Sequence, residues 1–275
     1  MSRETRSQNS LLWEVTHPDT DHKSYIFGTL KFIGEQEYYL PNKVTEVLNS
    51  CRIFTIEDQV DHHAQHELNK KLHFGKKESL QTVLTAEQYQ KVKAFFATEF
   101  GIDGNAFEKK YARLKPLALS IAMTRLSLKE EVKFYDIELL KMAKQNGLEA
   151  YSLEEIEREA TALNAFAMDD QVRALMHSIE NFSNQKNEYL ELEKAFTKGD
   201  IDRVFELTVH PFENNETFIE EFYHKRNREW VPKMKDMMLK QPSFLALGVA
   251  HLEGDQSILS LLRKEGFTLS PVPLN

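Results

Sequence analysis

The sequence predicts an α/β fold: a central mixed sheet built from N- and C-terminal segments, with a large helical insertion at about residues 62–240. Two short apolar runs at opposite ends of the chain, Tyr25–Phe27 and Phe244–Leu247, are each followed by a glycine, as expected of buried strands that end in turns. Between them the apolar residues have mainly helical spacing. Because no Gly/Ser- or Pro-rich linker divides the chain, we expect a single domain over residues 11–273.

Residues 11–60 are predicted to be rich in strands. Leu11–Val15 is a first strand, and the polar stretch His17–Lys23 is a hairpin turn before the return strand at Tyr25–Phe27. A helical pattern follows Pro41, and Arg52–Glu57 is expected to form a third strand. The order strand, turn, helix, strand is typical of an α/β sheet.

The insertion is predicted to consist almost entirely of helices. These are expected at residues 87–100, 116–128, 136–145, 153–180, 185–198, 200–208 and 213–240. Leu148–Tyr151 is a candidate strand within this region. After it, the chain is expected to return to a strand at 244–247, a helix near 254–265 and a last strand at Phe267–Val272.

Composition excludes several classes of protein. The net charge is −8, and no local basic patch is evident, so we expect neither a nucleic-acid nor an anionic-membrane partner. No apolar run approaches the ~20 residues that span a bilayer, and no apolar signal-peptide core follows the charged N-terminus, so a cytoplasmic protein is expected. The single cysteine, Cys51, cannot form an intramolecular disulfide and is interpreted as a buried, inert thiol.

Two similar segments at the ends of the predicted strands differ at one residue that matters chemically. Gly28 is followed three positions later by Lys31, and Gly248 is followed three positions later by His251. Glycine allows a sharp or positive-φ turn, so the third residue on can point into a cleft at the carboxyl end of the sheet. His251 can act there as a metal ligand or an acid–base group, whereas the ammonium of Lys31 cannot ligate a metal. A purely structural turn also explains each glycine.

Two further places carry candidate functional groups. Glu57 ends an apolar strand and can ligate a metal or act as a general base, although an ordinary exposed acid at a strand end fits equally well. Arg226 and Trp230 are four residues apart and therefore share one face of a helix. Arg226 can bind a carboxylate or a developing oxyanion. The alternative is a helix whose Trp packs on the core while its charges face water.

The histidines at residues 62–66 are not interpreted as a metal site. His62 and His66 have the i, i+4 spacing that can hold zinc, but the HExxH order is absent, since Lys70 stands where a second His is required after His66 and Glu67. A solvated helix face is the simpler interpretation.

Together these residues resemble the TraB/GumN family, which is related to the Tiki proteins. The resemblance covers almost the whole chain, from about residue 11 to residue 273. It is carried by the segments Leu12–Val15, Phe27–Leu30, Leu40–Pro41, Ile56–Asp58, Asp136 with Ala143, Ser152–Glu154, Gly199–Asp200, Arg226–Asn227 with Trp230, Gly248–Leu252 with Gly254, and Leu261–Arg263 with Gly266.

The resemblance implies an α/β fold with a helical lid and two Gly-x-x-His motifs that face one cleft. It also implies a metal-dependent hydrolase or metalloprotease, as for the Tiki relatives, and many members of the family are bacterial. By position, His251 and Glu57 match metal-site residues, and Arg226 and Asn227 match supporting polar residues that would stabilise developing negative charge. The first motif departs from the family, because Lys31 stands where the family has His.

Three consequences of Lys31 remain open at this point. A divalent metal (manganese, cobalt or zinc) can still bind weakly through Glu57 and His251. The ammonium of Lys31 can take the place of the cation by pairing with Glu57 or an anionic substrate. Finally, the fold can persist as a non-catalytic protein that binds a ligand in the cleft. The leading hypothesis is a hydrolase acting on a peptide or another small-molecule amide or ester, with Glu57, Arg226, Asn227 and Lys31 as catalytic residues. The sequence leaves the oligomeric state open.

Overall fold

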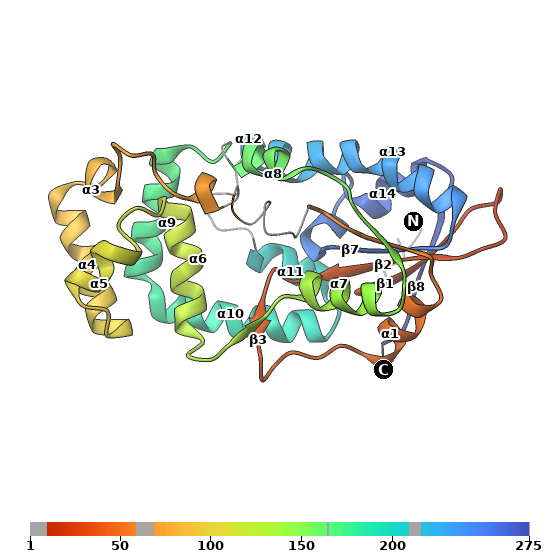
Figure 1. Cartoon of the computed structure of the whole chain (residues 1–275), viewed down its shortest axis with the longest axis horizontal. Coiled ribbons are helices and arrows are strands. Elements are labelled where there is room, and N and C mark those ends of the chain that lie inside the picture. The colour runs from red at the N-terminus through yellow and green to blue at the C-terminus, as the bar shows by residue number, and fades with distance from the viewer. Residues whose placement is uncertain (1–9, 59–65, 67–68, 164, 209–215, 275) are drawn as a thin grey trace, which may run out of the picture.

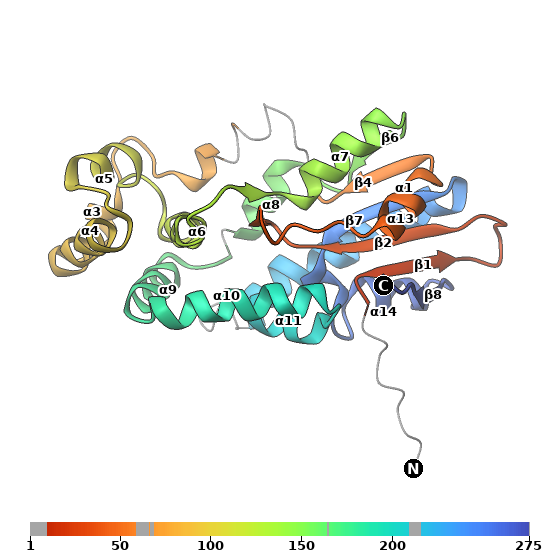
Figure 2. The ribbon, with the colours of Figure 1, turned by 90° about the horizontal axis from the view of Figure 1, so that it is seen from below.

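The structure of the protein is a computed structural model, and it describes residues 10–58, 66, 69–163, 165–208 and 216–274. Within these residues the fold is mixed α/β, as the sequence predicts. The molecule is elongated, with the central sheet toward one end and a group of helices at the other (Figures 1 and 2). Both ends of the chain contribute strands to the same sheet, which is the arrangement expected from the two apolar runs.

The central sheet has six strands in the order β6-β4-β7-β2-β1-β8. Its strands are β1 (Leu12–Thr16), β2 (Ser24–Thr29), β4 (Ile53–Ile56), β6 (Glu149–Ser152), β7 (Ser243–Gly248) and β8 (Thr268–Pro271). Strands β2, β7, β4 and β6 run parallel, whereas β1 is antiparallel to both β2 and β8. The residues of β4 and nearly all of β7 are buried, as expected of central parallel strands covered on both faces.

Helices cover both faces of the sheet (Figure 1). On one side lie α1 (Asn42–Asn49) and α7 (Tyr135–Gln145), and on the other lie α13 (Lys225–Lys240) and α14 (Ile258–Lys264). Their apolar faces complete the main core, in which Trp13, Phe54 and Trp230 are almost fully buried. Parallel order brings the carboxyl ends of β2, β7 and β4 to one edge of this core, where functional side chains can meet.

The helices farthest from the sheet have a hydrophobic core of their own. They are α3 (Leu80–Val83), α4 (Ala86–Phe100), α5 (Gly104–Lys110), α6 (Pro116–Ser127) and α9 (Met168–Glu180). Helix α4 begins with a capping box between Thr85 and Gln88 and ends at Gly101, whose φ of 66° requires the left-handed region. Inside this core Phe96 contacts Phe107 with ring centroids 5.0 Å apart.

The remaining helices connect the two ends of the molecule. They are α8 (Ile156–Leu163), α10 (Phe182–Thr197), α11 (Ile201–Thr208), α12 (Glu216–Ile219), the π-helix η1 (Glu220–His224) and the 3-10 helix η2 (Val249–Leu252). The prediction of one continuous helix over residues 153–180 is wrong, because α8 ends at Leu163 and α9 begins only at Met168. A small ladder of β3 (Ile33–Gly34) and β5 (Val132–Lys133) was not predicted, since two-residue strands leave no detectable alternation. None of the described helices is long and apolar enough to cross a membrane.

Candidate functional site

The candidate site lies where the parallel strands end. Thr29 of β2 pairs with Gly248 of β7, and Glu57 directly follows β4. Beyond the regular ladder, the backbone N–H of Glu154 donates to the carbonyl of Glu57 at 2.8 Å, so the β4–β6 pairing extends one residue further. The short η2 turn after β7 then carries His251 back toward Glu57. Sequence-distant residues are therefore gathered at one sheet edge.

Gly248 allows the carboxylate of Glu57 to approach the backbone closely. The Gly248 N–H donates to Oε1 of Glu57 at 2.5 Å, and a Cβ on Gly248 would lie only 2.9 Å from that same oxygen. Gly248 has a φ of −52° and Gly28 is not among the positive-φ glycines, so neither residue makes a positive-φ turn, although the chain does turn sharply into η2 after Gly248. At Gly28 a Cβ would lie 3.0 Å from Leu252. Both glycines serve close packing.

Arg226 is the buried centre of the site. Its guanidinium donates to Glu154 through Nη2 at 2.8 Å and through Nε at 3.0 Å, and Nη2 also reaches Oε2 of Glu57 at 3.2 Å. The Arg226 side chain is 1% exposed, so the interpretation in which this helix turns its charges to water is wrong for Arg226. As predicted from the i, i+4 spacing, Trp230 shares its face: the guanidinium lies 4.6 Å from the Trp230 ring.

Glu154 is a member of the site that residue chemistry alone did not single out. It is buried, and its carboxylate accepts from Arg226 and, at 2.9 Å, from the indole N–H of Trp230. Burial raises the pKa of Glu154, and the Arg226 charge opposes this shift. Its only signal in the sequence was its place in the Ser152–Glu154 segment that resembles the family.

A π-helix places the aromatic and polar residues around Arg226. Residues 213–240 were expected to form a regular helix, but η1 occupies Glu220–His224 immediately before α13, and the Lys225 N–H bonds the Glu220 carbonyl five residues back. The wider turn lets Nη1 of Arg226 donate to the Phe222 carbonyl at 3.2 Å and brings the Tyr223 ring 5.2 Å from His251. Such insertions are frequent at functional sites.

The hydrogen bonds of Asn227 fix the tautomer of His251. The Asn227 amide N–H donates to the Gln256 carbonyl at 2.8 Å, so its oxygen faces Nδ1 of His251, 2.6 Å away. Nδ1 therefore carries the proton, and the lone pair of Nε2 faces Nη1 of Arg226 at 3.4 Å and Oε1 of Glu57 at 3.9 Å. Asn227 positions the imidazole, and both the nitrogen and the oxygen of its side-chain amide are already engaged.

Burial keeps His251 neutral, whereas nearby positive charge and a backbone hydrogen bond keep Glu57 ionised. Burial lowers the pKa of His251 to about 3, and the nearby Glu57 charge opposes the shift without reversing it. For Glu57 burial acts to raise the pKa, whereas Arg226, the Gly248 N–H and Lys31 act to lower it, and the pKa lies below its usual value. Glu57 is accordingly an anion and His251 an uncharged ring near neutral pH.

Lys31 joins the site through a carboxylate that was not predicted. Its ammonium contacts Oε1 of Glu159 on α8 at 3.1 Å, and its side chain is 64% exposed while that of Glu159 is 7% exposed. Glu159 raises the pKa of Lys31, with smaller contributions from Asp58 and Glu57. The expected partner, Glu57, is therefore secondary, and Glu159 makes the direct ion pair.

Two further carboxyl groups border the site. Asp136, in the first turn of α7, accepts from the Thr29 hydroxyl at 3.0 Å, and burial raises its pKa to about 7. Asp58 follows Glu57, and burial together with the charge of Glu159 raises its pKa. With Glu57, Glu154 and Glu159, they make a strongly acidic environment for the cations Lys31 and Arg226.

The described residues do not fit a metal centre of the kind that the resemblance implies. Glu57 already accepts the Gly248 N–H with one oxygen and Arg226 with the other, and His251 offers a single nitrogen that faces the same guanidinium. Lys31 supplies no lone pair while it is charged. Among the residues that the structure describes, no group of at least three His, Cys, Asp or Glu side chains could hold a metal ion.

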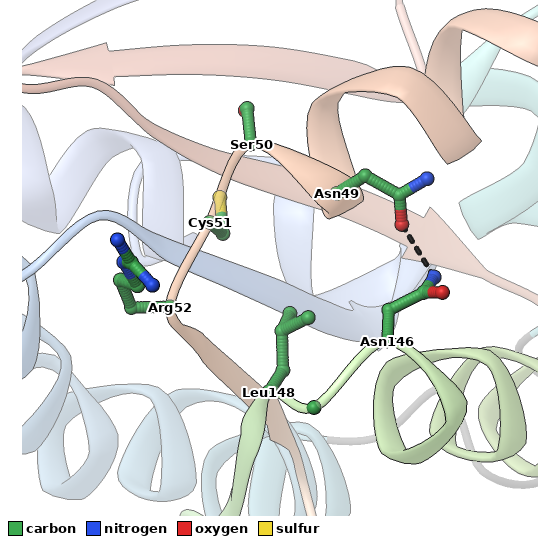
Figure 3. A pocket seen from close by; sticks show the side chains of 7 residues that line it. Asn49, Ser50, Cys51, Arg52, Asn146 and Leu148 are labelled. Carbon is green, nitrogen blue, oxygen red and sulfur yellow. Dashed lines mark hydrogen bonds between the residues drawn. The ribbon is translucent and has the colours of Figure 1, made fainter.

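The other sequence candidates lie away from this site. Residues 61–65 of the histidine segment are outside the described part of the chain, and His66 is exposed. Cys51 is buried, as expected, and burial raises the pKa of its thiol to about 12. It lines a polar pocket of about 280 Å³ with Arg52 and Leu148, just before β4 and β6 begin, and therefore at the opposite end of the strands from Glu57 (Figure 3).

Replacing Gly248 with alanine should destabilise the fold, because the new methyl group would collide with the Glu57 carboxylate. We expect a loss of about 1–3 kcal/mol in the free energy of unfolding, measured with urea. Gly104→Ala is the matched control, since its Cβ would meet only the flexible Lys93 side chain at 3.5 Å. Equal stabilities of the two variants would contradict the close approach of Glu57 to Gly248.

The depressed pKa of His251 predicts a pH dependence of stability. Unfolded His251 takes up a proton near its ordinary pKa of 6.5, whereas the folded residue resists protonation down to about 3. The free energy of unfolding should therefore decrease as the pH falls below about 6.5. Urea unfolding of wild type and His251→Gln between pH 7.5 and 5 isolates this contribution. An identical pH slope in the two proteins would show that His251 is not buried in its neutral form.

Comparison with known proteins identifies the family of this chain. The model of the TraB/PrgY/gumN family matches residues 11–271. The chain is 21% identical to "Metalloprotease TIKI2" of Danio rerio over 98% of its own length and 62% of the relative's. It is 20% identical to "Metalloprotease TIKI1" of Xenopus tropicalis over 99% of its own length and 63% of the relative's, so it spans less than two thirds of both relatives. No solved structure matches the chain. The match to the family model covers nearly all of the sheet and its helices, and the chain belongs to the TraB/PrgY/gumN family.

Proposed function

We propose that this chain is a hydrolase that cleaves an amide or ester bond in a peptide or another small molecule at the sheet edge beside Glu57. One observation carries the proposal: Glu57 is held as an anion by buried partners, yet its side chain is 18% exposed, against 1% for Arg226 and 3% for His251. An ionised carboxylate with a fixed orientation and an open face can accept a proton from water. The similarity to proteins named metalloproteases supports the same class of reaction.

In the proposed reaction Glu57 is the general base. It takes a proton from a water molecule whose oxygen attacks the carbonyl carbon of the substrate. The same proton then passes to the departing amine or alcohol as the carbon–heteroatom bond breaks. Because the Glu57 pKa lies below its usual value, this base is weak but fully ionised near neutral pH.

Lys31 is the proposed stabiliser of the oxyanion. Its ammonium has three N–H donors, and its side chain is largely exposed while it contacts Glu159. It can therefore turn an N–H toward the negative charge that develops on the carbonyl oxygen. Arg226 is less suited to this role, since its donors are engaged by Glu57, Glu154, the Phe222 carbonyl and His251. We assign Arg226 and Asn227 to the positioning of Glu57 and His251.

A second candidate function is ligand binding without catalysis. The burial of Arg226 and His251 and the mutual engagement of their polar atoms favour it, because such a closed network is also what a purely structural core requires. In that case the cleft would hold a ligand through Lys31 and Glu57, and the buried residues would only shape it.

Glu57→Gln should separate these two functions. If Glu57 is the base, the variant should lower kcat/KM by at least about 100-fold on any peptide or ester that the wild type cleaves, because the amide cannot take up the proton. Glu265→Gln, which alters a surface ion pair with Lys235, is the matched control. Circular dichroism would verify that each variant is folded.

Activity of Glu57→Gln close to that of wild type would contradict the assignment of Glu57 as base. Saturable ligand binding by a wild-type protein that hydrolyses none of a broad set of peptides and esters would favour the binding function instead.

A further inference from the structure

The ammonium of Lys31 lies among carboxyl groups that come from separate parts of the fold. Glu159 of α8 contacts it directly at 3.1 Å. Asp58 and Glu57, after β4, also attract it, and Asp136 of α7 interacts with the same charge. Lys31 lies two residues after the end of β2, which the parallel ladder places beside β7, and β7 lies beside β4. The ends of these strands, together with α7 and α8, therefore bring one cation and several acidic groups close together.

This cluster needs a cation close to its acidic groups. Glu159 is almost completely buried, and its second oxygen, Oε2, has no hydrogen-bond partner within the described part of the chain. A buried carboxylate is stable only when an opposite charge or hydrogen-bond donors compensate it. Arg226 compensates Glu154 and one oxygen of Glu57, so Lys31 is the cation that directly contacts Glu159.

We propose that the Lys31 ammonium, held by Glu159, is the resident cation of this site. It supplies the positive charge that a divalent metal would otherwise supply there. The ammonium can be held by the single carboxylate oxygen of Glu159, whereas a metal centre needs several ligands, which the described residues do not offer together. The protein would therefore work without a bound divalent ion. This inference goes beyond the proposed function and does not depend on it, because it concerns cation binding in the absence of substrate.

Removing the ammonium should convert the cluster into a site for an external cation. In Lys31→Ala, the carboxylates of Glu57 and Glu159 remain, with the carboxyl group of Asp58 beside them, and Glu159 loses the cation that contacts it. Oxygen ligands of this kind suit Mn²⁺. We expect Lys31→Ala to bind Mn²⁺ at least about tenfold more tightly than wild type, because the competing positive charge is gone.

Isothermal titration calorimetry of MnCl₂ into purified full-length protein, first treated with a chelator and then dialysed, tests the proposal. Lys235→Ala is the matched control, since Lys235 also pairs with one glutamate, Glu265, but on the surface. It should behave as wild type. The double variant Lys31→Ala/Glu159→Gln should lose the gained affinity, because the carboxylate that anchors Lys31 is also the carboxylate that a replacement cation needs. If Lys31→Ala does not fold, Lys31→Gln carries the same expectation.

Two results would overturn the proposal. One is equal Mn²⁺ affinity, or equal absence of binding, in wild type and the folded Lys31 variant, because Lys31 would then not hold the cation position. The other is tight binding by wild type that weakens when Lys31 is replaced. A gain in Lys31→Ala that persists in the double variant would place the cation away from Glu159 and would also contradict the proposal.

Discussion

The pairing of one buried guanidinium organises the whole candidate site. A charge as buried as that of Arg226 must be compensated by partners with correct geometry, or the fold would pay a large desolvation penalty. Here the partners come from different elements: Glu57 follows β4, Glu154 follows β6, and His251 lies on the turn after β7. The strands β4, β6 and β7 must therefore end level with one another at the sheet edge, so that all three side chains can reach Arg226. The same guanidinium also packs on Trp230, which ties the site to the main core.

This network explains why the ionisable groups of the site have different charges. Arg226 and the Gly248 N–H favour the anionic form of Glu57, whereas burial and Arg226 disfavour the cationic form of His251. The result is a fixed anion next to a neutral imidazole. On the more exposed side of the site, the positive charge of Lys31 compensates the negative charge of Glu159. Lys31, at the position where the resemblance implies a His, thus does more than remove one ligand, because it brings a positive charge to the acidic edge of the sheet.

The sheet and the location of the site could be predicted from the sequence because they rest on strong local signals. Apolar runs closed by glycine gave the strands that carry Phe27 and Leu247, and parallel order then placed Lys31, Glu57 and His251 at one edge. The i, i+4 spacing put Arg226 and Trp230 on one helix face. The role of each glycine was not predictable, since sequence does not distinguish a glycine needed for its φ from one needed for close approach.

Other parts of the site left no recognisable signal. Glu159 has the same helical, polar context as many solvated glutamates, and only the tertiary fold buries it against Lys31. The π-helix at Glu220–His224 has the composition of an ordinary helix. What sets it apart is tertiary packing, since Tyr223 and Arg226 both contact His251. Burial of Arg226 was likewise unforeseen, because helix periodicity gives a face but not the partner that covers it.

A crystal structure determined from crystals grown with MnCl₂, using manganese anomalous scattering, would test the central claim most directly. The account predicts that the Lys31 ammonium contacts Glu159, that Arg226 bridges Glu57 and Glu154, and that no manganese signal lies between Glu57 and His251. A manganese ion bound to Glu57 and His251, with Lys31 displaced from Glu159, would contradict it.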